Sequence, residues 1–310
     1  MERFTSDQPL PEQFRGAVLA LGNFDGFHLG HQAVASRAIA RAFHERRRVM
    51  IATFDPHPVR FFRPDTPPFQ LTSMEQRARL FAHAGADAML AFNFDADLAS
   101  TDAEDFVAEV LGRKLGIAVV VTGQDFTFGR GRSGNTDLLR DVGAANDIGA
   151  ESVAPVRLDE DIVSSSRIRK LLADGDPGAA THLLTRPFAI EAVVEHGDGR
   201  GRKLGYPTAN VRLGNYQRPQ RGIYAVTVRL DDGSEHQGAA SFGIRPMFDG
   251  GDEILEVYIF DFDGDLYGRT IDIALVAYLR PEAKFDSIDA LIAQMGEDER
   301  AARGLLGAAL

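Results

Sequence analysis

The first half of the chain alternates short apolar runs with longer amphipathic stretches. The apolar runs have the length of strands, whereas the amphipathic stretches have the length and periodicity of helices. The predicted strands are residues 17–21, 49–54, 88–92 and 117–122, and the predicted helices are 30–47, 75–84, 103–115 and 136–148. Strands that are apolar throughout are typical of a parallel sheet covered by helices on both faces. We therefore expect an α/β fold whose ligands bind beyond the carboxyl ends of the strands.

The pattern changes near residues 183–187. Beyond this point strand-like runs follow one another directly, and the short gaps between them are rich in Gly, Asp, Asn and Pro. These runs are residues 188–195, 223–230, 237–242, 254–262 and 271–279. Their succession is typical of an antiparallel β-barrel or sandwich. A last helix is predicted from Ser287 to about Leu306.

This change of pattern predicts two domains, residues 1–184 and residues 185–310. A length of 310 residues fits two domains of ordinary size. The hydrophobic share of 44% and the charged share of 25% are those of a soluble globular protein. The chain has no cysteine, which excludes disulfides and thiolate metal sites.

Charge and hydropathy restrict the partners. A net charge of −11 argues against a polynucleotide partner, because binding to a phosphate backbone needs a basic face. Small nucleotides remain compatible, since helix N-termini can bind them locally. The N-terminus has no apolar signal core, and no apolar run approaches the roughly 18 residues of a membrane span. We therefore predict a cytoplasmic protein that binds small molecules, without a membrane partner, and leave self-association open.

A glycine-rich loop joins the first predicted strand to the first predicted helix and ends in His-x-Gly-His. Glycines let a backbone approach phosphates, and a helix start supplies free N–H groups and a positive dipole end. Two histidines one turn apart would add the donors that transfer of AMP from ATP requires. Out of context, such a pair is more often solvated or capping. The residues expected to bind the nucleotide or stabilise its transfer are Gly22, Asn23, Asp25, His28, Gly30 and His31.

A second helix start of this kind follows at residues 164–169, with the sequence Ser-Ser-Ser-Arg-Ile-Arg. Serine hydroxyls cap helix starts, while Arg167 and Arg169 can neutralise phosphate oxygens. Seen alone, the segment is equally typical of an ordinary capped surface helix. Because it is the second basic helix start in the same predicted domain, we interpret it as a clamp on ATP.

Four motifs occur here in an order known from one enzyme family. They span residues 22–31, 53–58, 123–129 (followed by Arg132-Ser133-Gly134) and 164–169. Together they resemble the FMN adenylyltransferase half of the bifunctional riboflavin kinase/FAD synthetase family. The His-x-Gly-His motif alone would indicate only the wider nucleotidyltransferase superfamily with its Rossmann-like fold, whereas the Asp-Pro-His-Pro and Asp-Phe-x-Phe-Gly motifs point to flavin.

The resemblance implies that the phosphate of FMN attacks the α-phosphate of ATP, which yields FAD and pyrophosphate. His28, His31 and Arg167 would stabilise the transition state. Ser164, Ser165 and Arg169 would bind the nucleotide. No covalent enzyme intermediate is needed.

Flavin binding would need flat apolar walls and a few polar groups, because the isoalloxazine ring is apolar with polar edges. The chain has 21 phenylalanines and no tryptophan, and for any one phenylalanine core packing is the commoner role. His57 stands between two prolines in a rigid extended loop, which favours a positioning role over proton transfer. The residues expected around the flavin in this half are His57, Pro58, Phe62, Asp125, Phe126 and Phe128.

The second half opens with a loop of glycines and basic residues at 195–205. We expect Gly201, Arg202, Lys203 and Gly205 to fold over the phosphates of ATP, although such a loop alone is a weak signal. The following Pro-Thr-Ala-Asn run resembles the same motif of riboflavin kinases. That resemblance assigns Thr208 and Asn210 to the magnesium nucleotide, and their uncharged oxygens suit Mg²⁺.

Glu256 lies within the strongly apolar run 254–262. A carboxylate in such a run costs free energy unless it is paired or functional, although strand alternation also allows an outward-facing position. It can accept the proton of the 5′-hydroxyl of riboflavin as that oxygen attacks the γ-phosphate. The surrounding Leu-Glu-Val-Tyr resembles the family's catalytic strand, in which this glutamate is the general base. Arg280 and Phe285 would border the flavin, with surface and core roles equally open.

Two residues depart from the family pattern. Ser241 stands where the family usually has asparagine, and Met247 stands where it usually has threonine. The resemblance therefore predicts a bifunctional enzyme that converts riboflavin to FMN and FMN to FAD, with ATP and Mg²⁺. In one alternative only the adenylyltransferase half is active and the barrel merely binds flavin. In others, the chain is a flavin-binding sensor without turnover, or transfers a nucleotide to another phosphorylated substrate.

Overall fold

The chain divides into two compact units in the computed structural model, which describes residues 1–197, 201, 205–245 and 252–308. Unit 1 comprises Met1–Pro67 and Met74–Ser164, and unit 2 comprises Pro68–Ser73 and the chain from Ser165 onward. The short segment Pro68–Ser73 pairs within unit 2: the Gln70 N–H donates to the Asn215 carbonyl at 2.9 Å, and the Gln217 N–H donates to the Gln70 carbonyl at 2.7 Å.

Unit 1 is built on a six-stranded sheet in the order β1-β4-β3-β2-β5-β6. Every neighbouring pair is parallel. The strands are β1 (Glu2–Thr5), β2 (Val18–Leu21), β3 (Val49–Asp55), β4 (Ala88–Asn93), β5 (Val119–Gly123) and β6 (Gly149–Val153). A small antiparallel pair, β7 (Arg157–Leu158) and β8 (Asp161–Ile162), precedes the end of the unit. The predicted parallel α/β sheet is therefore confirmed.

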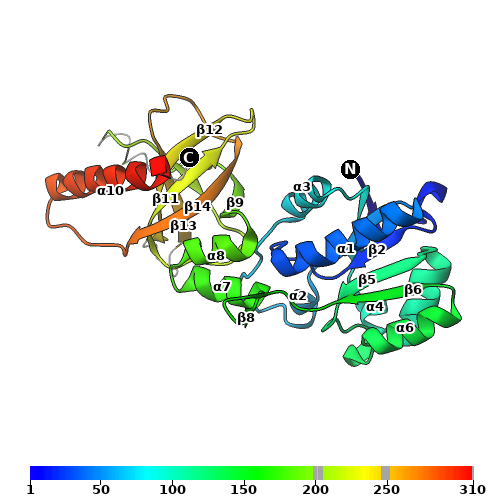
Figure 1. The fold of residues 1–310 in the computed structure, drawn as a ribbon. Coiled ribbons are helices and arrows are strands. Elements are labelled where there is room, and N and C mark those ends of the chain that lie inside the picture. Colours follow the sequence, from blue (N-terminus) through cyan, green and yellow to red (C-terminus); the bar gives the residue numbers. More distant parts are fainter. Residues whose placement is uncertain (198–200, 202–204, 246–251, 309–310) are drawn as a thin grey trace. The chain divides into compact units, whose positions relative to one another are not determined.

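Helices cover both faces of this sheet (Figure 1). They are α1 (Leu29–Glu45), α2 (Pro58–Phe62), α3 (Met74–Ala84), α4 (Ala96–Ser100), α5 (Ala103–Asp105) and α6 (Thr136–Ala145), with 3₁₀ turns at Glu12–Phe14 and Arg130–Arg132. Alternate residues of each strand point to opposite faces of the sheet and pack in two separate hydrophobic cores. In β2, Val18 and Ala20 pack with α1 and α3, whereas Leu19 and Leu21 pack with α6 and the segment after α5.

The helix expected over residues 103–115 is not one continuous α-helix. After α5 the chain continues as a π-helix over Phe106–Lys114. The wider turn keeps Phe106, Val107 and Leu111 buried against the sheet. Asp102 is the N-cap of α5, but its side chain makes no capping hydrogen bond.

The strand order places a topological switch at β2. The chain leaves β2 toward β3 and β4 on one side and later returns to β5 on the other side. In such sheets ligands bind at the carboxyl ends of the strands beside the switch. The loops after β2 and β5 are those that carry the glycine-rich and Asp-Phe-x-Phe-Gly motifs.

Unit 2 is built on an antiparallel sheet in the order β10-β13-β12-β11-β14-β9. Its strands are β9 (Phe188–Val193), β10 (Thr208–Val211), β11 (Gly222–Arg229), β12 (Glu235–Arg245), β13 (Asp252–Ile259) and β14 (Thr270–Arg280). A bridge between Glu195 and Asn210 joins the two edges of the sheet, because Glu195 follows β9 and Asn210 lies in β10. The predicted antiparallel second half is confirmed.

Helices flank this sheet in unit 2. They are α7 (Ser165–Ala173), α8 (Pro177–Leu184) and the long C-terminal α10 (Ile288–Ala308). The predicted last helix thus corresponds to α10, whose C-terminal end lies against the sheet in Figure 1. Ala302 and Leu306 of α10 form a core cluster with Ala225 and Phe260. No helix among the described residues is both long and apolar enough to cross a membrane.

Candidate active sites

The glycine-rich loop after β2 folds into the start of α1 through a tight, partly left-handed path. Phe24 and Phe27 have φ angles of 48° and 44°. His28 is the N-cap of α1, and its Nδ1 accepts a hydrogen bond from the His31 N–H at 3.4 Å. The two imidazole rings stack with their centroids 3.6 Å apart. The structure therefore brings the two predicted catalytic histidines together at one helix start.

Gly30 lies at a closely packed point of this helix start. A Cβ at Gly30 would lie 3.2 Å from His28 Cε1 and 3.5 Å from the Val163 carbonyl oxygen. The end of unit 1, just before Ser164, thus lies beside the histidine pair. Asp25 is buried and forms an ion pair with Arg77 of α3 at 3.1 Å. Gly22 and Asn23 form the start of the loop, directly after β2.

The second predicted helix start corresponds to α7, which begins at Ser165. Arg169 Nε donates to the Phe69 carbonyl at 2.7 Å, and its guanidinium lies 5.1 Å from the centre of the Phe69 ring. Arg169 is therefore engaged within unit 2. Arg167, near the same start, is partly exposed. Nucleotide binding by Ser164, Ser165, Arg167 and Arg169 stays a prediction.

Aromatic side chains gather at the carboxyl ends of β3, β4 and β5. Their ring centroids follow one another at 5.2 to 5.8 Å. The cluster comprises Phe54, Phe61, Phe62, Phe92, Phe94, Phe106, Phe126 and Phe128. Phe128 is 7% exposed, whereas Phe62 is 63% exposed. The cluster thus extends from the core of unit 1 to its surface.

His57 and Pro58 form the start of α2. The His57 Nδ1 accepts a hydrogen bond from the Val59 N–H at 3.2 Å, and Pro58 occupies the first turn of the helix. This cap fixes the short helix that carries the exposed Phe62. Asp125 is exposed in the loop after β5, between Gly123 and Phe126.

In unit 2, three polar residues form a row across neighbouring strands. Asn210 of β10 is paired with Glu256 of β13, and Glu256 is paired in turn with Ser241 of β12. Residues paired across antiparallel strands share one face of a sheet. Leu255 and Val257, on either side of Glu256, are both buried. Strand alternation therefore places Glu256 on the opposite face from these two residues, together with Asn210 and Ser241.

Gly197, in the loop before β10, packs directly against Asn210 of this row, and Gly201 packs against the residues that lead into β10. A Cβ at Gly197 would lie 2.4 Å from the Asn210 Nδ2, and a Cβ at Gly201 would lie 2.3 Å from the Tyr206 carbonyl oxygen and 3.4 Å from the Thr208 Oγ1. Gly205 has a left-handed φ of 87°. Arg202, Lys203 and Met247 lie outside the described residues.

Arg280 connects β14 to α10. Its Nε and Nη2 donate to the two carboxylate oxygens of Asp298 at 2.8 and 2.7 Å. The hydrogen bonds to Asp298 raise the pKa of the guanidinium. The same guanidinium lies 5.9 Å from the centre of the Phe285 ring. The two predicted flavin neighbours are therefore close together, and Arg280 also anchors the C-terminal helix.

The donor set around Thr208 suits a hard cation bound together with a nucleotide. Among the described residues no group of three or more His, Cys, Asp or Glu side chains can hold a metal ion. The hydroxyl of Thr208 and the amide oxygen of Asn210 are oxygen ligands of the kind that Mg²⁺ prefers. Few protein ligands are expected where substrate phosphates supply the others.

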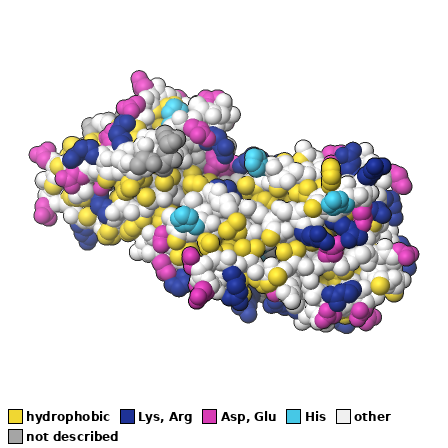
Figure 2. Space-filling view, in the orientation of Figure 1, with side chains coloured by type: hydrophobic (Ala, Val, Ile, Leu, Met, Phe, Trp, Pro, Cys, Tyr) yellow, Lys and Arg dark blue, Asp and Glu magenta, His cyan; other side chains and the backbone are white. Residues whose placement is uncertain are grey.

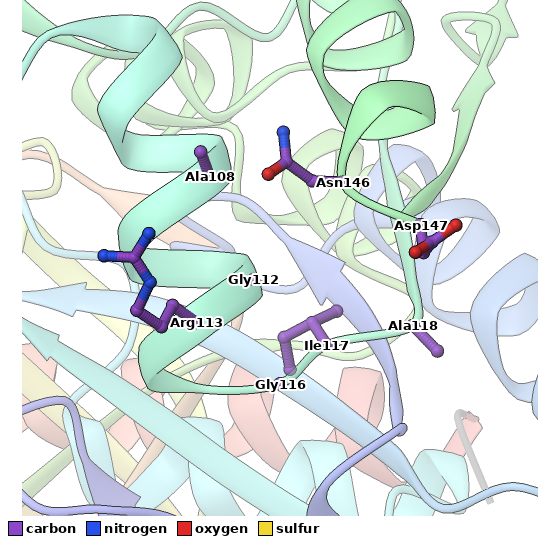
Figure 3. A pocket seen from close by; sticks show the side chains of 8 residues that line it. All are labelled: Ala108, Gly112, Arg113, Gly116, Ile117, Ala118, Asn146 and Asp147. Carbon is purple, nitrogen blue, oxygen red and sulfur yellow. The ribbon is translucent and has the colours of Figure 1, made fainter.

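A pocket of about 380 Å³ lies at the other end of the unit 1 sheet (Figure 3). The π-helix lines it with Ala108, Gly112 and Arg113, and the residues before β5 line it with Ile117 and Ala118. Because β2 and β5 are parallel, the amino end of β5 is opposite to the edge that carries the His28 loop.

Figure 2 shows acidic and basic side chains interspersed over one face of the molecule.

Two features of the sites were not predicted: the buried arginine Arg77 and the place of Ser241. Arg77 lies in a predicted helix, one helical turn from Phe81. This spacing puts it on the buried face of the helix, where an arginine is rare unless it is paired. Ser241 was noted only as a departure from a family pattern. Its place opposite Glu256 depends on strand register, which the sequence does not show.

The fold and the two sites define a nucleotide-dependent transferase with two catalytic units. One family model, described as FAD synthetase, matches residues 10–167, and another, described as riboflavin kinase, matches residues 184–306. The chain therefore belongs to the bifunctional riboflavin kinase/FMN adenylyltransferase family.

Relatives and a solved structure match this chain over nearly its whole length. The bifunctional riboflavin kinase/FMN adenylyltransferase of Escherichia coli K12 is 37% identical over 94% of this chain and 93% of its own. The enzyme of the same name from Pseudomonas fluorescens is 39% identical over 96% of this chain and 95% of its own. A Streptococcus pneumoniae crystal structure titled macrolide-efflux protein matches with a TM-score of 0.88 and 30% identity, over 98% of this chain and 99% of that one.

Proposed function

We propose that unit 2 phosphorylates riboflavin to FMN and that unit 1 adenylylates FMN to FAD. The family carries both activities, and each unit of this chain has its own set of reactive groups. The observation that supports the kinase assignment best is the row of Asn210, Glu256 and Ser241, which places a carboxylate beside the Pro-Thr-Ala-Asn strand. Both reactions consume ATP, and we assign them to the cytoplasm.

In the kinase reaction, Glu256 is the general base. The 5′-oxygen of riboflavin forms a bond to the γ-phosphorus of ATP, the bond from that phosphorus to the β–γ bridging oxygen breaks, and ADP leaves. The hydroxyl proton passes to the Glu256 carboxylate. Thr208 and Asn210 would hold Mg²⁺ and the nucleotide, and the ion when bound neutralises charge on the phosphate oxygens. The glycines at 197 and 201 keep the loop close to these two residues.

In the adenylyl transfer, an oxygen of the FMN phosphate attacks the α-phosphorus of ATP and pyrophosphate leaves. The His28 Nδ1 accepts a hydrogen bond, so in the neutral ring the proton is on Nε2. This makes Nε2 a donor for a phosphate oxygen, and the α1 N-terminus adds its positive dipole end. His31 would neutralise further charge, and the family resemblance assigns the same role to Arg167. Gly22 and Gly30 would give the backbone room to approach the phosphates, and Asn23 would contact the nucleotide.

The flavin of the adenylyl-transfer site would lie on the exposed edge of the aromatic cluster. Phe62 offers the largest exposed ring among the predicted residues, and His57 and Pro58 fix its helix. Phe126 and Phe128 stack on each other at 5.8 Å and would form the inner wall. Asp125 is placed to contact a polar edge or a ribityl hydroxyl.

Separated-function variants test this assignment. The purified protein is incubated with riboflavin or FMN, ATP and Mg²⁺, and riboflavin, FMN and FAD are resolved by chromatography over time. Glu256→Gln is expected to slow FMN formation from riboflavin by about 10²–10⁴-fold, the usual contribution of a general base, and to leave FAD formation from FMN unchanged. His28→Ala is expected to slow FAD formation from FMN and to leave FMN formation from riboflavin unchanged.

The matched control is Glu253→Gln, on the same strand as Glu256. Glu253 is paired with Arg218 at 2.7 Å, and its loss is expected to leave both conversions intact. Riboflavin phosphorylation that persists in Glu256→Gln would contradict the role of Glu256. Failure of the wild-type protein to convert either substrate would contradict the whole assignment.

A further inference from the structure

We infer that Arg77 is a positioning residue of the adenylyl-transfer site, although it does not contact a reacting atom. The inference rests on the function proposed for the His28 loop. Arg77 belongs to α3, which carries none of the sequence motifs, and its side chain is 2% exposed. It acts through Asp25 and Thr53 on the backbone that leads to the histidine pair.

Three hydrogen bonds connect Arg77 to the loop. The Arg77 Nη2 donates to the Asp25 Oδ1 at 3.1 Å, and Nη1 donates to the Thr53 Oγ1 at 3.1 Å. The Thr53 hydroxyl then donates to the Asn23 carbonyl at 2.7 Å. One guanidinium therefore fixes the loop through the side chain of Asp25 and, by way of Thr53, through the backbone of Asn23.

The loop needs such support because its backbone is strained. Phe24 and Phe27 adopt left-handed φ angles of 48° and 44°. Side chains other than glycine adopt this region rarely, and persist there only where the surroundings hold them. Both rings pack on Phe81 of α3, with centroids 5.8 and 5.1 Å away. Arg77 and Phe81, one helical turn apart, thus hold the same loop from the same helix.

The support continues to the reactive histidines. The Phe24 ring lies edge-on to His31 at 5.2 Å, and His31 stacks on His28 at 3.6 Å. A shift of the loop would therefore move both imidazoles relative to the phosphates. A misplacement of about 1 Å can lower a rate by about 10²-fold. The expected defect is in kcat, because the histidines act mainly in the transition state.

A role in stability alone is the competing explanation for this ion pair. Removing charges from water is costly, and replacing a buried pair by apolar residues is often neutral or stabilising. A buried pair is thus weak evidence for a contribution to stability. Here the hydrogen bonds of Arg77 hold a strained loop, which favours a positioning role over a role in stability alone.

The test uses the full-length protein and its two activities. Arg77→Met is expected to lower the kcat of FAD formation from FMN by about 10–100-fold and to change riboflavin phosphorylation less than about twofold. Arg77→Lys, which keeps a charge and one contact, is expected to recover part of that loss. Arg79→Met, an exposed arginine on the same helix, is the matched control and is expected to match the wild type in both reactions.

A second variant keeps the test valid if Arg77→Met does not fold. Thr53→Val removes the hydroxyl that accepts from Arg77 Nη1 and donates to the Asn23 carbonyl, but leaves the Arg77–Asp25 ion pair in place. It is expected to lower the kcat of FAD formation several-fold. Thermal unfolding by circular dichroism verifies that each variant is folded at the assay temperature.

Two results separate the inference from the proposed function. If folded Arg77→Met and Thr53→Val both form FAD at the wild-type rate while His28→Ala does not, Arg77 is not a positioning residue. If His28→Ala also forms FAD at the wild-type rate, the function proposed for the loop itself is wrong.

Discussion

Asn210 and Glu256 lie directly opposite each other on the neighbouring strands β10 and β13. The proposed base and the amide proposed to hold the nucleotide therefore occupy adjacent places on one face of the sheet. This arrangement depends on register, because a slip of one residue would move every side chain of a strand to the other face. The bridge from Glu195 to Asn210 holds β10 on its second side, with the Glu195 N–H donating to the Asn210 carbonyl at 2.8 Å.

Ser241 is expected to assist Glu256 in the kinase reaction. Paired residues on one face have Cβ atoms about 4.5–5.5 Å apart, which brings a serine hydroxyl within reach of the carboxylate. A hydrogen bond to a charged group is worth about 1.5–3 kcal/mol, and a share of that in the transition state gives about a 3–10-fold rate effect. We therefore expect Ser241→Ala to lower riboflavin phosphorylation by that factor, measured as FMN formed per minute. FAD formation from FMN is the internal control, and an unchanged kinase rate would contradict the prediction.

Gly197 is expected to tolerate no side chain. A methyl group there would approach the Asn210 Nδ2 to 2.4 Å, so Gly197→Ala must displace either the loop or the amide. We expect riboflavin phosphorylation to fall by at least about tenfold, because the proposed nucleotide site is distorted. Gly304→Ala on α10 is the matched control, since a Cβ there meets nothing within 4 Å. Equal kinase rates for the two variants would show that the loop is not part of the site.

Removal of the Phe62 ring is expected to weaken FMN binding, whereas removal of the Phe128 ring is expected to lower the stability of the fold. Phe62 is 63% exposed, so Phe62→Ala should leave the melting temperature nearly unchanged. The loss of one ring contact, worth about 0.5–1.5 kcal/mol, should raise the KM for FMN by up to about tenfold. Phe128 is 7% exposed, and Phe128→Ala should cost about 3–5 kcal/mol of stability.

Steady-state kinetics and thermal unfolding of the two phenylalanine variants check this contrast. Phe43→Ala, at an 81% exposed position on α1, is the control for removing an exposed ring. A wild-type KM for FMN in Phe62→Ala would place the flavin elsewhere.

Acid is expected to weaken unit 2 partly through Asp232, in the turn between β11 and β12. Hydrogen bonds from Ser234, joined by Arg269, lower the pKa of Asp232 from 3.8 to about 2. A carboxyl group whose pKa is lower in the folded state stabilises the fold above the unfolded pKa and loses that contribution as the pH falls through the folded value. The contribution is therefore present above pH 3.8 and disappears toward pH 2.

Melting temperatures of the wild type and Asp232→Asn between pH 5 and pH 2 measure this contribution. The wild type should be the more stable protein at pH 5, and the difference should shrink as the pH falls. A difference that stays constant over this range would assign it to a cause other than ionisation.

The order and type of most elements were predictable because their signals are local. The apolar runs that became β2 to β5 and β11 to β14 are contiguous in the sequence, and the glycine-rich loop and helix start at His28 form one segment. Strands β1, β6, β7, β8 and β10 were missed. β1 and β6 have exposed, mixed side chains, β7 and β8 have two residues each, and β10 has only four. The π-helix over Phe106–Lys114 was also missed, because its wider turn follows from packing against the sheet.

The sequence by itself determined the family, the two kinds of domain and the segments that carry reactive side chains, because those signals lie within short stretches of chain. Only the tertiary structure decided which distant residues meet. Register brings Asn210, Ser241 and Glu256 into one row, and packing of α3 brings Arg77 to Asp25 across 52 positions of sequence. The physical reason is that strand register and the partner of a buried charge are settled by the whole fold, which no local pattern encodes.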